Sequence, residues 1–189
     1  KKISKNNYEE LRKNEYKKYD RVLKNSYAAV ANNNQEVVFI HFPFPHPPSI
    51  YAQELFNNNN TDLNFDYLLN LKFSDVVLGN ILEILNKKSL SQNILLIVSS
   101  DHGLRSEIKM RFQPARKIPL IIGISKDKSK HMVNKKISSY HIKDLIGKFL
   151  KQEINTNYDI ANFFSNSDFV PTTNLNEDLL LKRRNSKLK

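Results

Sequence analysis

Cysteine is absent from the 189 residues, and so are long hydrophobic runs. Without cysteine the chain forms neither a disulfide framework nor a thiolate zinc site. No apolar run approaches the roughly 18 residues that a membrane span needs, and the N-terminus lacks the apolar core of a secretory signal. Because the sequence begins at Lys1 and not at Met, we expect it to be a trimmed chain or a piece of a longer one. Its length is sufficient for one domain with a sizeable core.

Acidic residues are few compared with basic ones. The chain has 19 Asp and Glu against 30 Lys and Arg, which gives a net charge of +11 and a pI of about 9.7. Such a balance favours anionic partners such as nucleic acid, phosphate-bearing substrates or an acidic membrane surface. The aromatic residues follow apolar patterns and are not interleaved with arginine, as a stacking platform for nucleic acid requires. We therefore expect an anionic partner and no specific nucleic acid.

Hydrophobic periodicity predicts an α/β fold. Apolar residues at three- and four-residue spacing indicate helices, and short runs rich in β-branched residues indicate strands buried on both faces. A strand, a helix and a further strand in succession favour a right-handed parallel crossover. We therefore expect a mostly parallel sheet flanked by helices in one domain, residues 1–155, and a polar basic C-terminal extension, residues 156–189. The predicted helices are residues 7–31, 66–88 and 140–150, and the predicted strands are residues 37–40, 94–98 and 118–124.

A carboxylate and an imidazole follow the predicted strand 94–98 directly. Asp101 and His102 stand just past its carboxyl end, and Gly103 after them allows a sharp turn. Ligands bind at this end of the strands in open α/β sheets. Asp and His are ligands that suit divalent zinc or manganese. The other interpretation is a polar loop in which Asp101 caps a turn.

The predicted strand 37–40 leads into a loop with four prolines, residues 41–48. The prolines exclude a helix and hold the loop semi-rigid. His46 on this loop is a candidate site residue; the alternative is a Pro-rich surface turn. For His41, a place in the site and a place inside the core are both open. Arg105, in the charged segment after Gly103, could hold phosphate or sulfate oxygens or lie in a solvated loop.

Three stretches carry a resemblance to a known family. They are residues 39–48 with Pro-His-Pro-Pro, residues 70–85, and residues 96–105 with Ser-Asp-His-Gly. Taken together and in this order, they resemble the alkaline phosphatase and sulfatase superfamily, and within it the sulfatase-like hydrolases and transferases. The resemblance covers roughly residues 20 to 150.

The resemblance implies a fold of the alkaline-phosphatase and sulfatase type and metal-dependent cleavage or transfer of a phosphate or sulfate ester. On this basis Asp101 and His102 are ligands of one divalent cation, which could be Mn, Zn, Ca or Mg. His46 contacts the ester or protonates the leaving oxygen, and His41 and Arg105 lie on the substrate side. The substrate would be an anionic ester, and glycan-linked and lipid-linked esters both fit.

The sequence departs from the family pattern in one respect. The family's nucleophile is a Thr, Ser or Cys-derived residue in an earlier strand-turn segment beside a further acidic ligand, and neither is found here; the nucleophile is unknown. Three interpretations follow, and only the first makes the chain part of an enzyme. The chain is the C-terminal portion of a sulfatase-like enzyme, or an inactive member that binds anions or proteins, or an unrelated basic α/β module for nucleic acid or anionic lipid. Relatives include membrane-anchored and soluble proteins, so the compartment stays open, and membrane association would use segments outside this chain.

Overall fold

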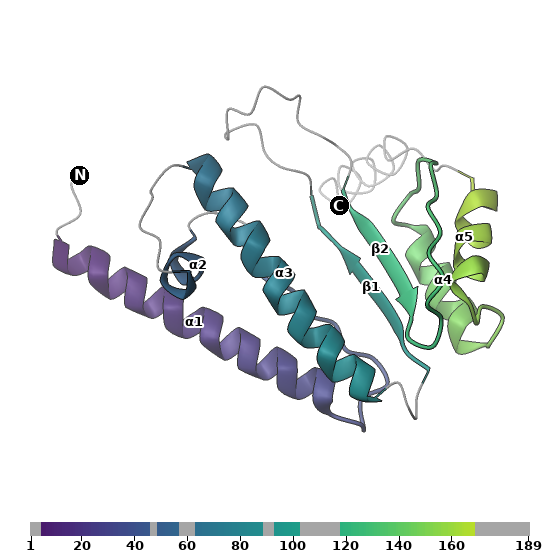
Figure 1. Cartoon of the computed structure of the whole chain (residues 1–189), viewed down its shortest axis with the longest axis horizontal. Coiled ribbons are helices and arrows are strands. Elements are labelled where there is room, and N and C mark those ends of the chain that lie inside the picture. Colours follow the sequence, from purple (N-terminus) through teal and green to yellow (C-terminus); the bar gives the residue numbers. More distant parts are fainter. Residues whose placement is uncertain (1–4, 46–48, 57–62, 89–92, 103–117, 169–189) are drawn as a thin grey trace, which may run out of the picture. The chain divides into compact units, whose positions relative to one another are not determined.

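The computed structural model describes residues 5–45, 49–56, 63–88, 93–102 and 118–168 (Figure 1). These residues form two compact units. Unit 1 contains the described residues of Lys1–Gln92 and Ser99–Pro119, and unit 2 those of Asn93–Val98 and Leu120–Lys189. None of the helices in these ranges is both long and apolar enough to cross a membrane. The elements are α1 (Lys5–Ala31), α2 (Ile50–Leu55), α3 (Leu63–Lys88), β1 (Leu95–Ser99), β2 (Leu120–Ile124), α4 (His141–Leu150) and α5 (Asn157–Asn166).

Unit 1 is built on the two long helices that the sequence predicts, α1 and α3, with the short α2 packed against both. Helix α3 carries Asp66 in its first turn and basic residues in its last turn, which suits the helix dipole. The Lys88 Nζ atom donates hydrogen bonds to the carbonyl oxygens of Val30 (2.9 Å) and Asn32 (3.0 Å), so the end of α3 is tied to the end of α1. The buried core residues are Tyr19, Leu23, Val30, Ala52, Leu69, Phe73, Val77 and Ile81.

The predicted strand 37–40 is wrong as a buried strand. The Val37 side chain is 71 % exposed and that of Phe39 is 92 % exposed. Ile40, Phe42 and Phe44 alternate with them and pack against the core of unit 1. The alternation is that of a strand covered on one face, but in the part of the chain that the structure describes the sheet holds only β1 and β2. The segment therefore lacks the partner strand whose hydrogen bonds would make it β-structure.

Unit 2 contains the two-stranded sheet, and its strands are antiparallel. The Ser125 amide, just after β2, donates to the Ile94 carbonyl oxygen at 2.9 Å, and the Ser99 hydroxyl at the end of β1 donates to the Pro119 carbonyl oxygen at 3.0 Å. The start of one strand thus meets the end of the other. The expected mostly parallel sheet is not seen in the described ranges, because the strand that was to lie parallel to β1, residues 37–40, is not paired.

Two helices cover one face of this small sheet. Figure 1 shows α4 and α5 on the same side of β2, and α5 contacts both β2 and α4. Leu95 and Ile97 from β1 and Leu120 and Ile122 from β2 pack against the buried residues. The sequence predicted strands that are buried on both faces. In the structure both strands are half-buried, so this expectation is wrong for β1 and β2. The buried residues of this cluster are Ile124, Leu145, Ile154, Ile160 and Phe164.

Helix α5 lies where the sequence predicted a polar extension. It begins with a capping box, in which Thr156 Oγ1 accepts a hydrogen bond from the Asp159 amide (3.1 Å) and Asp159 Oδ2 accepts one from the Thr156 amide (2.9 Å). These bonds satisfy donors that the first turn of a helix leaves free. The asparagine-rich composition concealed the helix, and the buried Ile160 and Phe164 bind it to the core.

We expect Thr156→Ala to lower the free energy of unfolding by about 1 kcal/mol, because the Asp159 amide loses its acceptor at the helix start. Chemical denaturation followed by circular dichroism measures the change. Thr156→Ser keeps the hydroxyl and serves as the control, for which we expect almost no loss. Equal destabilisation by both variants would show that the methyl group matters and the cap does not.

Candidate functional site

Asp101 and His102 stand in a turn that begins where β1 ends. Two serines shape this turn with their hydroxyl groups. Ser99 Oγ donates to the Pro119 carbonyl oxygen, and Ser100 Oγ donates to the carbonyl oxygen of His102 at 2.6 Å. The second bond closes the backbone over residues 100–102. The Ser-Ser-Asp-His sequence thus ends the strand and places a carboxylate and an imidazole side by side.

The two side chains are close together and open to solvent. Asp101 Oδ1 lies 3.8 Å from His102 Nε2, and the side chains are 69 % and 42 % exposed respectively. At this distance the contact is an ion pair only when the imidazole is protonated. Because solvent reaches both groups, a ligand could approach them without opening the protein.

The described part of the Pro-rich loop, residues 41–45, packs against the core of unit 1 through its phenylalanines. Phe44 contacts the ring of buried Phe73 with 4.9 Å between centroids, and Phe42 stacks on Phe44 at 4.8 Å. His41 lies just before these rings and is exposed, so the interpretation of His41 as a core residue is wrong. His46 and Arg105 lie outside the described residues.

A buried polar cluster holds the segment that follows the prolines. Ser49 is fully buried, and its hydroxyl donates to Asp66 Oδ1 in the first turn of α3. Gln53 Nε2 of α2 donates to the same carboxylate oxygen at 2.9 Å. These bonds compensate a carboxylate that is only 5 % exposed. Sequence reasoning missed this cluster; a serine directly after two prolines and an aspartate at a helix start were its only signals.

An aromatic stack reinforces the same region. Tyr51 of α2 stacks on Tyr16 of α1 at 4.6 Å and contacts Phe73 of α3 at 5.0 Å. Burial, with smaller contributions led by Tyr16, raises the pKa of the Tyr51 hydroxyl to about 12. Tyr51 therefore keeps its proton near pH 7, and its ring packs between α1 and α3.

The match to a family model decides what these residues belong to. The model described as Sulfatase matches residues 1–172, which is most of the chain. The chain belongs to the sulfatase family. No curated protein and no solved structure matched it.

Membership in the sulfatase family confirms the resemblance that the three sequence stretches indicated. It places the chain in the superfamily of sulfatase-like hydrolases, whose domains have an α/β fold. The interpretation as a basic module unrelated to sulfatases is therefore wrong. The match also extends beyond residue 155 and includes α5.

Sulfatases generally use a divalent metal, and Asp101 and His102 fit part of such a site. A carboxylate oxygen and an imidazole nitrogen are suitable donors. Ligands lie about 2.0–2.6 Å from zinc or calcium, so one cation can contact two atoms that are 3.8 Å apart. Among the described ranges, however, no group of three His, Asp or Glu side chains could hold a metal. The described residues of this sulfatase-family chain thus supply at most two His, Asp or Glu ligands of one cation.

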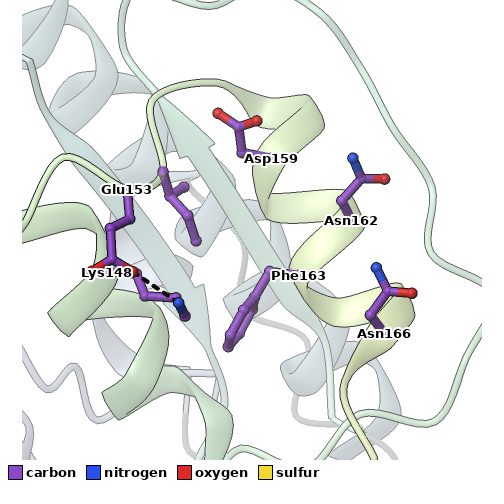
Figure 2. A pocket seen from close by; sticks show the side chains of 7 residues that line it. Lys148, Glu153, Asp159, Asn162, Phe163 and Asn166 are labelled. Atoms are coloured by element: carbon purple, nitrogen blue, oxygen red, sulfur yellow. Dashed lines mark hydrogen bonds and ion pairs between the residues drawn. The ribbon is translucent and has the colours of Figure 1, made fainter.

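Unit 2 has an open surface pocket that contains none of the predicted site residues. Figure 2 shows its polar rim, where Lys148 Nζ and Glu153 Oε2 form an ion pair at 2.8 Å. Asp159 on this rim is already engaged in the capping box of α5. The pocket therefore does not replace the turn after β1 as the candidate site. Its lining residues are Lys148, Glu153, Ile154, Asp159, Asn162, Phe163 and Asn166.

We expect Ser49→Ala to destabilise the sulfatase-family chain by about 1–3 kcal/mol, because the buried Asp66 carboxylate loses a hydrogen-bond donor. Thermal and chemical unfolding would measure the loss. Ser74→Ala in α3 is the control. Its hydroxyl donates only within the helix, to the Asn70 carbonyl oxygen at 2.8 Å, and alanine favours helix formation. If the two variants were equally stable, Ser49 would not anchor the segment after the prolines.

Proposed function

We propose that this sulfatase-family chain supplies the metal-binding and substrate-side part of an active centre that cleaves or transfers a phosphate or sulfate ester. The observation that carries the proposal is the pair Asp101 and His102, 3.8 Å apart in an exposed turn at the carboxyl end of β1. The family match over residues 1–172 supports it, because it includes this turn and the Pro-rich loop. The net charge of +11 favours an anionic ester as substrate.

In this proposal Asp101 and His102 are ligands of one divalent cation, which could be Mn, Zn, Ca or Mg. When bound, the cation would polarise an ester oxygen and stabilise negative charge. His46 would give a proton to the leaving oxygen, since an imidazole titrates near neutral pH. His41 and Arg105 would contact the anionic oxygens. The alcohol part of the substrate, glycan or lipid linked, would be selected by the walls of the site.

The nucleophile of the proposed reaction belongs to residues outside this sequence. No cysteine is present, so no Cys-derived formylglycine forms within these 189 residues. We propose that a further segment of the complete protein brings the nucleophile and the missing acidic ligand, with residues 1–155 as part of one α/β domain. The exposed pair Asp101 and His102 would then be completed by ligands from that segment.

The same proposal extends to the sheet. Residues 37–44 have the alternation of a strand, with Val37 and Phe39 exposed on one face and Ile40, Phe42 and Phe44 packed on the other. We propose that in the complete domain this segment is a strand of a mostly parallel sheet. Such pairing would satisfy its backbone groups.

Hydrogen exchange of the complete protein measures this pairing directly. We expect the amides of residues 37–42 to exchange as slowly as those of β1, because both would be hydrogen-bonded within one sheet. The exposed residues 130–132 serve as the internal control and should exchange quickly. Fast exchange in residues 37–42 would contradict the proposed strand.

An inactive member of the family is the second candidate function. It is favoured by the observation that the described residues supply only two metal ligands. Such a protein would bind a metal or an anionic ester without turnover, or would serve as an interaction domain. The two candidates differ in one measurable quantity, which is the hydrolysis or transfer of an ester by the complete protein.

A comparison of two sets of variants separates metal binding from chemistry in the complete protein. We expect Asp101→Ala and His102→Ala to reduce binding of Mn²⁺ or Zn²⁺ by about 10-fold or more in calorimetric titrations, and turnover to fall with it. His46→Ala should retain the metal and lose about 100-fold or more of the turnover of an aryl phosphate or aryl sulfate. Loss of turnover with the metal retained is the signature of a proton donor.

Asp75→Ala and His131→Ala are the matched controls, since both side chains are exposed and lie outside the candidate site. We expect them to change neither property. Unchanged metal affinity in Asp101→Ala and His102→Ala would remove these residues from the metal site. Full activity in His46→Ala would remove His46 from the chemistry. Binding without any turnover in the unmodified protein would select the inactive member.

A further inference from the structure

The segment after β2 carries a concentration of positive charge. Five of the residues in 126–136, here called the basic segment, are lysines, and Asp127 is its one acidic residue. Three of the lysines recur at every second position. The lysines are Lys126, Lys128, Lys130, Lys135 and Lys136, and all five are exposed.

Hydrogen bonds fix the basic segment to α5 at both of its ends. Near its start, Asp127 Oδ2 accepts a bond from the Asn157 amide (2.6 Å), and Asn157 Nδ2 donates to the carbonyl oxygen of Ser129 (2.9 Å). Near its end, Lys135 Nζ donates to the carbonyl oxygens of Ser165 (3.0 Å) and Ser167 (2.6 Å). The segment therefore follows α5 from its first turn to its last.

Asp127 is occupied by this anchoring. Its Oδ1 atom accepts a hydrogen bond from the Ser129 amide at 2.8 Å. Backbone and side-chain hydrogen bonds from Ser129, together with the bond from Asn157, hold the pKa of the Asp127 carboxyl below its usual range. The carboxylate thus faces the backbone donors of its own loop and of α5, and among the described residues no carboxylate forms an ion pair with Lys126, Lys128 or Lys130.

Apolar groups are exposed among these lysines. The Met132 side chain is 86 % exposed, while its neighbour Val133 packs into the core of unit 2. Tyr158, at the second position of α5, is 58 % exposed, and its ring lies 5.7 Å from the His131 ring. The anchored segment thus carries exposed lysines and an exposed thioether, and an exposed aromatic ring lies beside its His131.

This combination fits the surface of an anionic lipid bilayer better than nucleic acid. Lysines close to a membrane are attracted by its negative surface potential, and their stems can lie along apolar material. Tyrosine is enriched at the boundary between lipid and water, and an apolar side chain such as Met132 can enter it. Nucleic-acid recognition relies strongly on arginine, and residues 118–168 contain none.

We propose that the basic segment, with Met132 and Tyr158, is a docking surface for a bilayer that contains anionic lipids. The basic segment includes neither Asp101 nor His102, and the proposal does not depend on their proposed function. It would hold the domain beside a negatively charged membrane without a membrane-spanning helix.

Vesicle co-sedimentation of the full chain tests the proposal. We expect binding to vesicles of phosphatidylcholine mixed with phosphatidylglycerol, and little binding to phosphatidylcholine alone. The triple variant Lys126→Ser, Lys128→Ser, Lys130→Ser should weaken the binding by roughly 10-fold or more. Met132→Ser should weaken it severalfold, and Met132→Leu should retain it. All of these side chains are exposed, and circular dichroism checks that each variant is folded.

A matched variant separates the proposed surface from net charge. Lys13→Ser, Lys17→Ser, Lys87→Ser removes three exposed lysines of unit 1 and the same total charge. We expect it to bind vesicles nearly as well as the unmodified chain. An equal loss in both triple variants would overturn the proposal in favour of general charge attraction, and so would the absence of binding to the anionic vesicles. An oligonucleotide bound more tightly than the vesicles at physiological salt, with the same loss in the first triple variant, would assign the surface to nucleic acid.

Discussion

The buried ring of Phe73 in α3 holds the residues on either side of the prolines in place. It is 2 % exposed, and the rings of Phe44 and Tyr51 contact it with 4.9 and 5.0 Å between centroids. Phe44 lies in the first half of the Pro-rich loop and Tyr51 follows the loop, so the buried Phe73 side chain contacts residues on both sides of it. Two turns earlier on the same helix, Asp66 receives the Ser49 hydrogen bond. Both flanks of the loop are thus fixed to α3, once by apolar contact and once by a buried polar bond.

The turn after β1 is held in a different way. Hydroxyl groups of Ser99 and Ser100 shape the backbone of this turn, and the side chains of Asp101 and His102 are both accessible to solvent. The rigidity of such a site would come largely from the metal and its further ligands, as is usual where metal binding and local order are coupled.

The sequence could predict those parts of the fold that depend on local periodicity. Helices α1, α3 and α4 and strands β1 and β2 follow from the spacing of apolar residues, and each agrees with the structure to within three residues at either end. The sequence did not predict α2, which has only six residues and depends on the buried contact between Ser49 and Asp66. It also did not predict α5, because asparagine-rich composition favours a loop until Ile160 and Phe164 are seen to be buried.

For the candidate site, the sequence could predict which residue types follow the end of a strand, but not the contacts that hold them. Asp101 and His102 are neighbours in the chain, so their proximity needed no long-range information. The anchoring of the Pro-rich segment needed contacts between residues 17 positions apart, such as Ser49 and Asp66, which periodicity does not reveal. The same limit applies to residues 37–40. Their composition indicates a strand, but pairing also requires a partner strand, which the sequence of these residues alone does not identify.

Two features that look like defects share one explanation under the proposed function. Phe39 is 92 % exposed although Ile40 beside it packs against the core of unit 1, and Asp101 and His102 would supply two ligands of the proposed metal site. A large exposed apolar patch on a soluble protein marks a surface that another segment or partner contacts. A further segment of a sulfatase-type domain would cover the first and complete the second. Under the proposed function, one further segment would therefore cover the outer face of residues 37–44. The same segment would bring the missing acidic ligand and the nucleophile to the turn after β1.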